Sequence, residues 1–343
     1  MSSTPSALSV AVTGPTGTFG FGLIPLLQAE PRVGRIVGIA RRPFEPQAYG
    51  WTKMKYRRGD VRDEDALREA FDGVEVVVHL AFMITGNASA RVIREINITG
   101  TLNAFRAARE AGVERFVYAS SVAAYGFHAD NPVGMSEDWP VRPAARLFYA
   151  REKAELEKSL WRESRAGSGP ELYLLRPPIV LGPHAAGAKE FMPAPLSRAG
   201  RTAFAALRRL PVPLPMLAPN VPVQFIHEED VGQALLKCVL GEGPAGAYNI
   251  AGDGVVTGAE LIRELGLAPV PVPARVFYAG ARAAAAVPRL PFLPPATEWV
   301  EALSHPAIMD TTKARQELGW KPRYSALEAL RATLEGGDQT LAG

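Results

Sequence analysis

The chain of 343 residues holds a single cysteine, Cys238, so no disulfide bond can form within one copy. Small extracellular domains often depend on disulfides, and we therefore expect a reducing compartment, with Cys238 as a buried core residue rather than a nucleophile. The amino terminus lacks the positive charges that open a secretory signal peptide and runs directly into an apolar segment. Together these absences predict a cytoplasmic protein.

Long uninterrupted apolar segments and long basic segments are also missing. The most apolar late segment, residues 276–293, is interrupted by two arginines and two prolines, which argues against a membrane span. The net charge is only +3, and the arginines stand in scattered pairs rather than in a basic block. We therefore expect neither nucleic acid nor a membrane among the partners, and a small molecule as the substrate.

Short apolar segments alternate with amphipathic ones through the first half of the chain. Segments dense in β-branched, leucine and aromatic residues predict strands buried on both faces, at residues 8–13, 35–40, 74–82, 114–121 and 171–180. Helices with apolar residues three and four apart are predicted between them, at residues 63–73, 98–113 and 148–163. This alternation predicts an α/β fold with a doubly wound parallel sheet of the Rossmann type.

The second half of the chain changes in composition. Residues 182–222 are rich in proline, alanine, glycine and arginine, and the carboxy-terminal part is helical with proline-rich joints. We predict a dinucleotide-binding domain of residues 1–176 and 223–251, and a smaller, mostly helical substrate lobe of residues 177–222 and 252–335. The ligand is expected between the two, because clefts between lobes are common binding sites.

Three glycines follow the first predicted strand at regular spacing, in the segment GPTGTFG from Gly14 to Gly20. A glycine-rich turn between a strand and a helix lets backbone N–H groups and the helix dipole face a pyrophosphate. The spacing alone is equally compatible with a plain packing turn. Gly22 and Pro25 fall inside the following helix, where Pro25 removes a hydrogen bond and should kink it.

The end of the second predicted strand lacks the acidic residue that would bind the ribose hydroxyls of NAD. Ala40 stands at that position, and Arg41 and Arg42 follow it. A carboxylate would repel a 2′-phosphate, whereas a guanidinium can hold one by charge-assisted hydrogen bonds. We therefore favour NADP as the cofactor and keep NAD as the alternative. Without a ligand, the two residues would be a solvated arginine pair.

Tyr149 and Lys153 lie four residues apart in a predicted helix and therefore share one face. A lysine ammonium beside a phenol lowers the pKa of that phenol, which can then exchange a proton near neutral pH. Tyr49 and Lys53 have the same spacing but lie in a glycine-containing linker, so we treat that pair as a coincidence. Ser121 ends the fourth predicted strand, where a serine can hydrogen-bond a substrate oxygen or simply form a turn.

In combination, these segments resemble the extended short-chain dehydrogenases/reductases, the family that includes the NAD-dependent epimerases and dehydratases. Ten matching segments occur in the family's order from residue 13 to about residue 322: TGPTGTFG, GDVRD, HLAF, NITGTLN, SSVAAYG, YAREK, LRPPIVLGP, QFIHEEDV, AYNIAG and LGWKP. One motif would be a weak indication, whereas ten in order cover nearly the whole chain.

The resemblance implies roles for individual residues. Ser121, Tyr149 and Lys153 would form the catalytic triad, in which Tyr149 exchanges a proton with the substrate oxygen and Ser121 orients that oxygen. Lys153 would also hold the nicotinamide ribose, and Asp60 with Val61 would flank the adenine. The predicted cofactor-binding set is Gly14, Thr16, Gly17, Thr18, Phe19, Gly20, Arg41, Arg42, Asp60, Val61, Leu80, Ala81, Asn97, Tyr149, Lys153 and Pro177. No metal ion is expected.

The sequence departs from the nucleotide-sugar enzymes of this family at two positions. Ile179 stands where they usually carry an asparagine, and Val223 where they tend to carry an arginine. Both replaced groups would grip the diphosphate of a sugar nucleotide, whose charges are costly to bury without partners. Apolar residues also mark the variable lobe, namely Phe191, Met192, Pro193, Met216 and Leu217. They suit a hydrophobic alcohol, ketone or aldehyde, or they only pack the lobe.

We therefore predict an NAD(P)-dependent oxidoreductase that acts by hydride transfer on the hydroxyl or carbonyl group of a small, largely apolar substrate. A nucleotide-sugar epimerase or dehydratase remains an alternative, in which Arg198 or Arg201 would hold the diphosphate. A dinucleotide sensor without catalytic activity is the other alternative. The resemblance also implies a homodimer built on the helices that contain Asn103 and Lys153, and structural roles for His227 and Asp230.

Overall fold

A computed structural model of the chain describes residues 7–84, 88–145, 147–185, 213–277, 279 and 305–335. Its centre is a sheet of seven parallel strands in the order β3-β2-β1-β4-β5-β6-β10. The strands are β1 (Leu8–Thr13), β2 (Val33–Ala40), β3 (Met54–Arg58), β4 (Val76–His79), β5 (Arg115–Ala119), β6 (Glu171–Arg176) and β10 (Gly246–Asn249). The strand order reverses between β1 and β4, which confirms the predicted doubly wound α/β fold.

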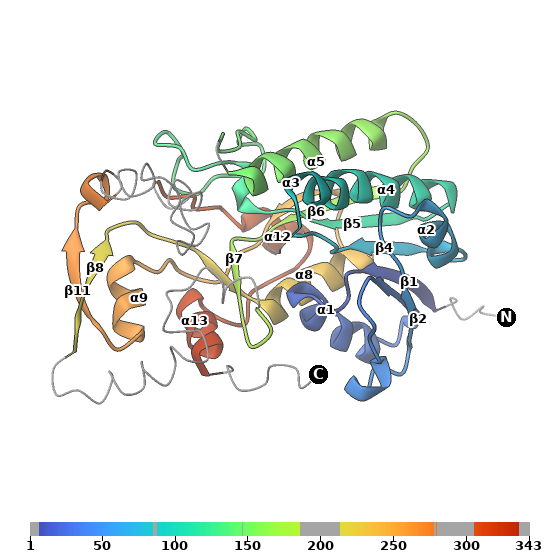
Figure 1. Ribbon diagram of the computed structural model, residues 1–343, viewed down its shortest axis with the longest axis horizontal. Helices are drawn as coiled ribbons and strands as arrows, with labels where there is room; N and C mark the ends of the chain where they lie inside the picture. Colours follow the sequence, from blue (N-terminus) through green and yellow to red (C-terminus); the bar gives the residue numbers. More distant parts are fainter. Residues whose placement is uncertain are drawn as a thin grey trace.

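Helices cover both faces of this sheet. Figure 1 shows α1 (Thr18–Ala29) and α8 (Glu228–Val239) on one face, and on the other face α2 (Glu64–Phe71), α4 (Gly100–Glu110) and α5 (Phe148–Arg165). Val10 packs in a cluster with Leu23 of α1, whereas its neighbour Ala11 packs in a second cluster with Phe105 of α4. Successive strand residues point to opposite faces, so an unbroken apolar strand is what two helical layers require.

The remaining elements lie mainly beyond the carboxyl ends of the central strands. A short helix α3 (Ala90–Arg94) continues through a π-helical turn, η2 (Glu95–Thr99), into α4, and the 3-10 turns are η1 (Pro46–Tyr49) and η3 (Val122–Ala124). Two small parallel sheets pair β7 (Ile179–Leu181) with β9 (Phe225–His227), and β8 (Pro215–Pro219) with β11 (Ala268–Val272). The other helices are α9 (Gly258–Glu264), α12 (Thr312–Glu317) and α13 (Ala326–Glu335).

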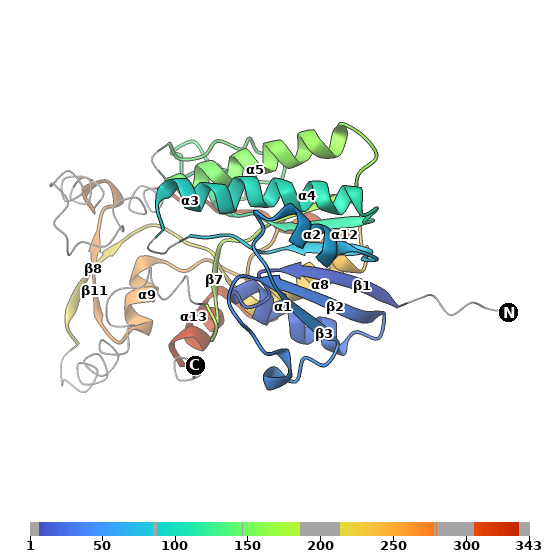
Figure 2. The same ribbon diagram turned by 45° about the vertical axis from the view of Figure 1, so that its right-hand side comes forward.

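The group formed by β8, β11 and α9 lies at the end of the molecule opposite the amino terminus, as Figures 1 and 2 both show. These elements belong to the segments from which we predicted a substrate lobe. The seven central strands all belong to the segments predicted as the dinucleotide-binding domain, but β7 and β9 pair across the predicted boundary. The division into two domains stays a prediction. Several residues used to predict the substrate lie outside the described residues: Phe191, Met192, Pro193, Arg198 and Arg201.

The strand β3 lacks the apolar pattern by which the other strands were predicted. It reads MKYRR, and within it only Met54 is buried. Because β3 lies at the edge of the sheet, most of its side chains need no apolar neighbours, and charged residues at an edge discourage pairing with other chains. A prediction that looks for runs of apolar residues therefore misses this strand.

A close contact between α1 and α8 explains Gly22, for which the sequence offered no reason. A Cβ atom at Gly22 would lie 2.1 Å from the carbonyl oxygen of Glu228, and one at Gly232 would lie 2.0 Å from the carbonyl oxygen of Gly22. Glycine at both positions lets the two helix backbones touch. The helix α1 continues through Pro25 to Ala29.

We expect Gly232→Ala to lower the free energy of unfolding by about 1–3 kcal/mol, as overpacking usually does. Alanine would normally stabilise a helix interior by about 0.5–1 kcal/mol relative to glycine. Here the added methyl group meets backbone atoms of Gly22, which cannot rotate away. Urea unfolding measures the difference. Gly167→Ala is the control, since a Cβ there has nothing within 4 Å; equal stability of the two variants would contradict the close contact.

Candidate active site

A cavity of about 410 Å³ opens at the carboxyl ends of the central strands, where the strand order reverses. Its lining comes from the loops after β1, β2, β3 and β4, from the ends of β2 and β5, and from α1, η2 and α5. Twelve of the predicted cofactor-binding residues line it: Gly14, Thr16, Gly17, Thr18, Phe19, Arg41, Arg42, Val61, Leu80, Ala81, Tyr149 and Lys153.

The glycine turn at the start of α1 fits a pyrophosphate. Gly14 has a φ of +69°, and a Cβ there would lie 3.0 Å from the backbone of Ala81, so this turn requires glycine. Gly17 precedes α1, and within the described residues no side chain caps the helix and no acidic residue occupies its first turn. The first N–H groups of a helix have no partner inside it, and together with the helix dipole they suit an anion in the cavity.

A buried histidine fixes the strand ends that form the cavity. The His79 ring lies 3.0 Å from the Thr13 hydroxyl on one side and 3.0 Å from the Thr101 hydroxyl on the other. The Thr13 oxygen also accepts hydrogen bonds from the backbone N–H groups of Leu80 and Ala81. Burial lowers the pKa of His79 to about 3, so the ring stays neutral and acts as a structural link between β1, β4 and α4.

The three predicted catalytic residues come together beside the cavity, although Ser121 is not among the described residues that line it. Tyr149 and Lys153 lie on the first turns of α5, and both line the cavity. Ser121 follows β5, caps the turn η3 through the N–H of Ala123, and forms a hydrogen bond with Tyr149. The Lys153 ammonium is buried, and its Nζ lies 5.8 Å from the centre of the Tyr149 ring.

The expected effect of Lys153 on Tyr149 is not what the structure shows. Burial raises the pKa of Tyr149 to about 12, against the lowering effect of its hydrogen bond with Ser121. Lys153 instead donates to the backbone oxygen of Ala119 (2.6 Å) and to the hydroxyl of Tyr118 (3.1 Å). Its own pKa is lowered to about 7 by burial. The prediction of a phenol with a pKa near neutral pH is therefore wrong for this arrangement, because the effect of burial exceeds that of the hydrogen bond with Ser121.

Four predicted cofactor residues are not among the described residues that line the cavity: Gly20, Asp60, Asn97 and Pro177. Gly20 is buried inside α1. The Asp60 carboxylate pairs with Arg62 at 2.8 Å, which lowers the pKa of Asp60. Asn97 lies in the π-helical turn and accepts from the N–H of Met83 at 2.7 Å, so it holds the loop that forms one wall. The Pro177 carbonyl accepts from the N–H of Val122, next to Ser121.

The part of the cavity lining that follows β2 carries positive charge. Arg41 and Arg42 are exposed and line the cavity after β2. Their backbone is fixed from β3, since the Tyr56 hydroxyl donates to the carbonyl of Arg42 and the Arg58 side chain donates to that of Arg41. The guanidinium groups are thus presented by a fixed strand end, beside the position where the sequence carries Ala40 in place of an acidic residue.

Comparison with known proteins agrees with this geometry. The family model described as "NAD dependent epimerase/dehydratase family" matches residues 10–251. The chain belongs to the NAD-dependent epimerase/dehydratase family. An uncharacterised protein of Mycobacterium tuberculosis is 27% identical over 332 residues, which cover 93% of this chain and 81% of that protein.

The names of two further similar proteins refer to different molecules, a sterol and UDP-glucose. Sterol demethylase protein B of Methylococcus capsulatus is 32% identical over 179 residues, 51% of this chain and 52% of that protein. The crystal structure of UDP-glucose 4-epimerase from Thermus thermophilus, in complex with NAD, has a TM-score of 0.67 at 23% identity, and the match covers 97% of this chain and 100% of that chain. At this identity the structural likeness shows the fold.

Sequence reasoning missed one wall of the cavity in this family member. Phe82, Met83 and Ile84 follow β4 and line the cavity, and the Lys153 Nζ lies 3.9 Å from the centre of the Phe82 ring. The Phe82 ring also meets Tyr149 edge-on, with centroids 5.6 Å apart. The signal was present, because HLAF was among the matching segments and its apolar run continues past the end of the strand.

His227 and Asp230 hold the carboxy-terminal loop to the fold. The His227 ring stacks on Tyr324 with centroids 4.0 Å apart. The Asp230 carboxylate accepts from the backbone N–H groups of Arg323 and Tyr324. These contacts agree with the structural roles expected for both residues.

The described part of the chain contains no helix with the length and apolar character needed to cross a bilayer. Within the same residues, no cluster of three or more histidine, cysteine, aspartate or glutamate side chains is arranged to hold a metal ion.

Proposed function

We propose that the protein is an NADP-dependent oxidoreductase that acts on the carbonyl or hydroxyl group of a small, largely apolar molecule. The observation that carries this proposal is the Ser121–Tyr149–Lys153 group, of which Tyr149 and Lys153 line the cavity of about 410 Å³. Tyr149 and Lys153 both contact the Phe82 ring, and the arginines after β2 also line the cavity.

The side chains have separate tasks in such a reaction, in which the bound nicotinamide would supply or accept the hydride. Burial raises the pKa of Tyr149 to about 12, so its hydroxyl is protonated at neutral pH and can donate a proton to a substrate carbonyl oxygen. Ser121, already hydrogen-bonded to Tyr149, orients that oxygen. The Lys153 ammonium offsets the negative charge that develops on the phenol when the proton leaves.

The apolar surroundings favour a substrate without phosphate groups. Ile179 and Val223, at the two positions where family members that bind nucleotide sugars carry polar groups, pack beside the buried Leu181 and Phe225 and are not among the described residues that line the cavity. At these two positions, only the lack of a polar group therefore supports the proposal. The name of the Methylococcus relative, sterol demethylase protein B, is in line with an apolar substrate. The name of the Thermus enzyme supports the competing candidate, a nucleotide-sugar epimerase.

Two measurements separate these candidates. We expect NADPH oxidation with members of a panel of apolar ketones and aldehydes, and no heat of binding when UDP-glucose or dTDP-glucose is titrated into the NADP-loaded protein. Micromolar binding of either sugar nucleotide would favour the epimerase/dehydratase instead. Cofactor binding without turnover of any compound in the panel or of either sugar nucleotide would favour a dinucleotide sensor.

Cofactor choice gives a separate prediction. Hydrogen bonds to charged groups contribute about 1.5–3 kcal/mol each, so removing one guanidinium from a 2′-phosphate should weaken NADPH binding about tenfold or more. We expect this for Arg41→Ala and Arg42→Ala in a fluorescence titration, with NADH affinity changed less than about twofold. Arg57→Ala is the matched control, since Arg57 pairs with Glu69 at the surface. Equal weakening of both cofactors would contradict the proposed role.

A further inference from the structure

A buried ion pair between Arg176 and Glu157 lies next to the segments that carry the three catalytic candidates. The Arg176 guanidinium donates through Nη2 to Glu157 Oε2 at 2.6 Å and through Nε to Oε1 at 3.0 Å. The exposed fractions of the two side chains are 5% and 3%. Glu157 also accepts a hydrogen bond from the Ser120 hydroxyl. A charge pair buried this deeply is costly to desolvate, and replacing it by apolar residues often leaves stability unchanged, so stability alone gives no reason for it.

Ser120, Glu157 and Arg176 each lie beside a residue of the active site, either as its neighbour in the chain or on the same face of a helix. Ser120 precedes Ser121 at the end of β5. Glu157 follows Tyr149 and Lys153 on α5 at successive intervals of four, so the three share one face of the helix. Arg176 ends β6 immediately before Pro177. The ion pair therefore joins the two strand ends and the helix that carry the catalytic groups.

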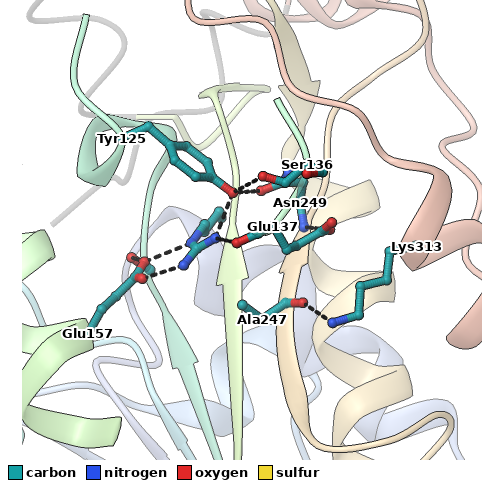
Figure 3. A network of polar contacts seen from close by, with 9 residues as sticks. Tyr125, Ser136, Glu137, Glu157, Ala247, Asn249 and Lys313 are labelled. Atoms are coloured by element: carbon teal, nitrogen blue, oxygen red, sulfur yellow. Dashed lines mark hydrogen bonds and ion pairs between the residues drawn. The ribbon is translucent and has the colours of Figure 1, made fainter. Parts of the chain in front are cut away.

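Further contacts fix Arg176 from its other side. Its Nη1 donates to the Tyr125 hydroxyl at 2.6 Å and to the carbonyl of Glu137 at 3.1 Å. The Tyr125 hydroxyl lies 2.8 Å from Asn249 Oδ1, and the N–H of Asn249 donates to the Glu137 carboxylate at 2.7 Å. Figure 3 shows this network running from Glu157 on α5 to Asn249 at the end of β10. The guanidinium thus has little freedom to move away from Glu157.

We propose that Glu157, held in place by Arg176, is a positioning residue of the active site that ties the helix of Lys153 to the strand end before Ser121 and keeps the Lys153 side chain charged. The inference rests on the proposed function for its catalytic consequence, although its effect on Lys153 can be measured without any substrate.

The charged and titratable groups around Lys153 agree with this role. Burial lowers the pKa of Lys153, and Glu157 and then Glu152, both on α5, act against that effect. Glu152 is itself engaged by Asn97 at 2.7 Å. From β5 the lysine faces the Tyr118 hydroxyl, from β4 the neutral His79, from its own helix Tyr149, and from the loop after β4 the Phe82 ring. Among these, Glu157 and Glu152 are the carboxylates that oppose the effect of burial.

The direct test is the titration of Lys153 in the full-length protein. The eight lysines can be labelled with ¹³C at Cε, and the Lys153 signal assigned from its loss in Lys153→Met. We expect Glu157→Gln to lower the pKa of Lys153 by about one unit, which is a tenfold change in its protonation equilibrium. Glu163→Gln is the control, since Glu163 lies on the same helix and pairs at the surface with Arg106 and Arg109. An unchanged Lys153 titration in Glu157→Gln would overturn the proposal, whatever the activity.

The catalytic consequence is tested by the pH profile of kcat/KM. If the wild type reduces a carbonyl compound, we expect the alkaline limb of Glu157→Gln to lie about one pH unit lower, with about a tenfold loss at pH 8. If the wild type proves inactive but the titration moves as expected, the proposed function fails and the role of Glu157 toward Lys153 stands. A shifted titration with an unshifted profile in an active enzyme would overturn the catalytic part.

A double variant separates this role from simple stabilisation. Single substitutions that leave a buried charge unpaired can prevent folding, whereas replacing both charges often preserves stability. Arg176→Met combined with Glu157→Gln removes both charges and leaves a side-chain oxygen to accept from Ser120. We expect this variant to fold and still to show the lowered Lys153 pKa and the tenfold loss. A folded double variant with the wild-type titration and pH profile would mean that the pair is only structural.

Discussion

Tyr149→Phe is expected to lower kcat by about 10³, within the range of about 10²–10⁴ that a positioned proton donor contributes. The substitution removes only the hydroxyl, and the ring keeps its edge-on contact with Phe82. Cofactor affinity should stay within about twofold of the wild type, because the ring still fills its place in the lining. Steady-state turnover of NADPH with any accepted carbonyl compound, and a cofactor titration by fluorescence, measure the two quantities.

The matched control is Tyr118→Phe. Tyr118 is also buried, lies on β5, and its hydroxyl accepts directly from Lys153 at 3.1 Å. Unlike Tyr149, it is not among the described residues that line the cavity. We expect a loss of less than about tenfold for this variant. Comparable losses in both variants would contradict Tyr149 as the proton donor, and near-normal turnover in Tyr149→Phe would do so outright.

The sequence predicted those features of the site that depend on residues close together in the chain. A glycine turn directly after a strand and a tyrosine four residues before a lysine are local patterns, and the fold places both as expected. The same spacing in Tyr49 and Lys53 has no such outcome. Tyr49 stacks on Phe44, whereas the Lys53 ammonium donates to the carbonyl of Glu30. Local spacing predicts a pair only where a helix aligns it.

The features that the sequence did not predict depend on contacts between distant segments. Arg176 lies 19 positions from Glu157 and 51 from Tyr125 in the chain, and a pattern along one element does not reveal such partners. The close approach of Gly22 to Gly232 is of the same kind. Desolvation is also a property of the assembled fold, which is why the spacing of Tyr149 and Lys153 predicted the wrong direction for the phenol pKa.

Lys153→Met is expected to abolish most activity and, at pH 7, to stabilise the protein. The pKa of the buried Lys153 is lowered to about 7 from an ordinary value of 10.5. That difference corresponds to about 5 kcal/mol, the penalty for keeping the ammonium charged in the folded state. Methionine removes the penalty but leaves the Ala119 carbonyl without its hydrogen bond, which costs about 1–3 kcal/mol. The net expectation is a gain of about 2–4 kcal/mol in the free energy of unfolding.

The sign of the pH dependence makes this prediction specific. Between the folded pKa near 7 and the unfolded value of 10.5, the unfolded chain binds more protons than the folded one. The wild type therefore gains up to about 1.4 kcal/mol of stability per pH unit as the pH rises, and below pH 7 the whole penalty remains. The advantage of the methionine variant should be largest at pH 6–7 and vanish about 1.5–3 units higher, at about pH 8.5–10.

Urea unfolding of both proteins at pH 6, 7, 8 and 9 measures this difference, with Lys158→Met as the control. Lys158 lies on the same helix but is exposed, so its removal should leave the pH dependence unchanged. A methionine variant that is less stable than the wild type at pH 7 would show that the hydrogen bonds of Lys153 outweigh its desolvation. A gain in stability together with a loss of turnover would instead show that Lys153 supports activity at the expense of stability. Active-site residues commonly have this effect.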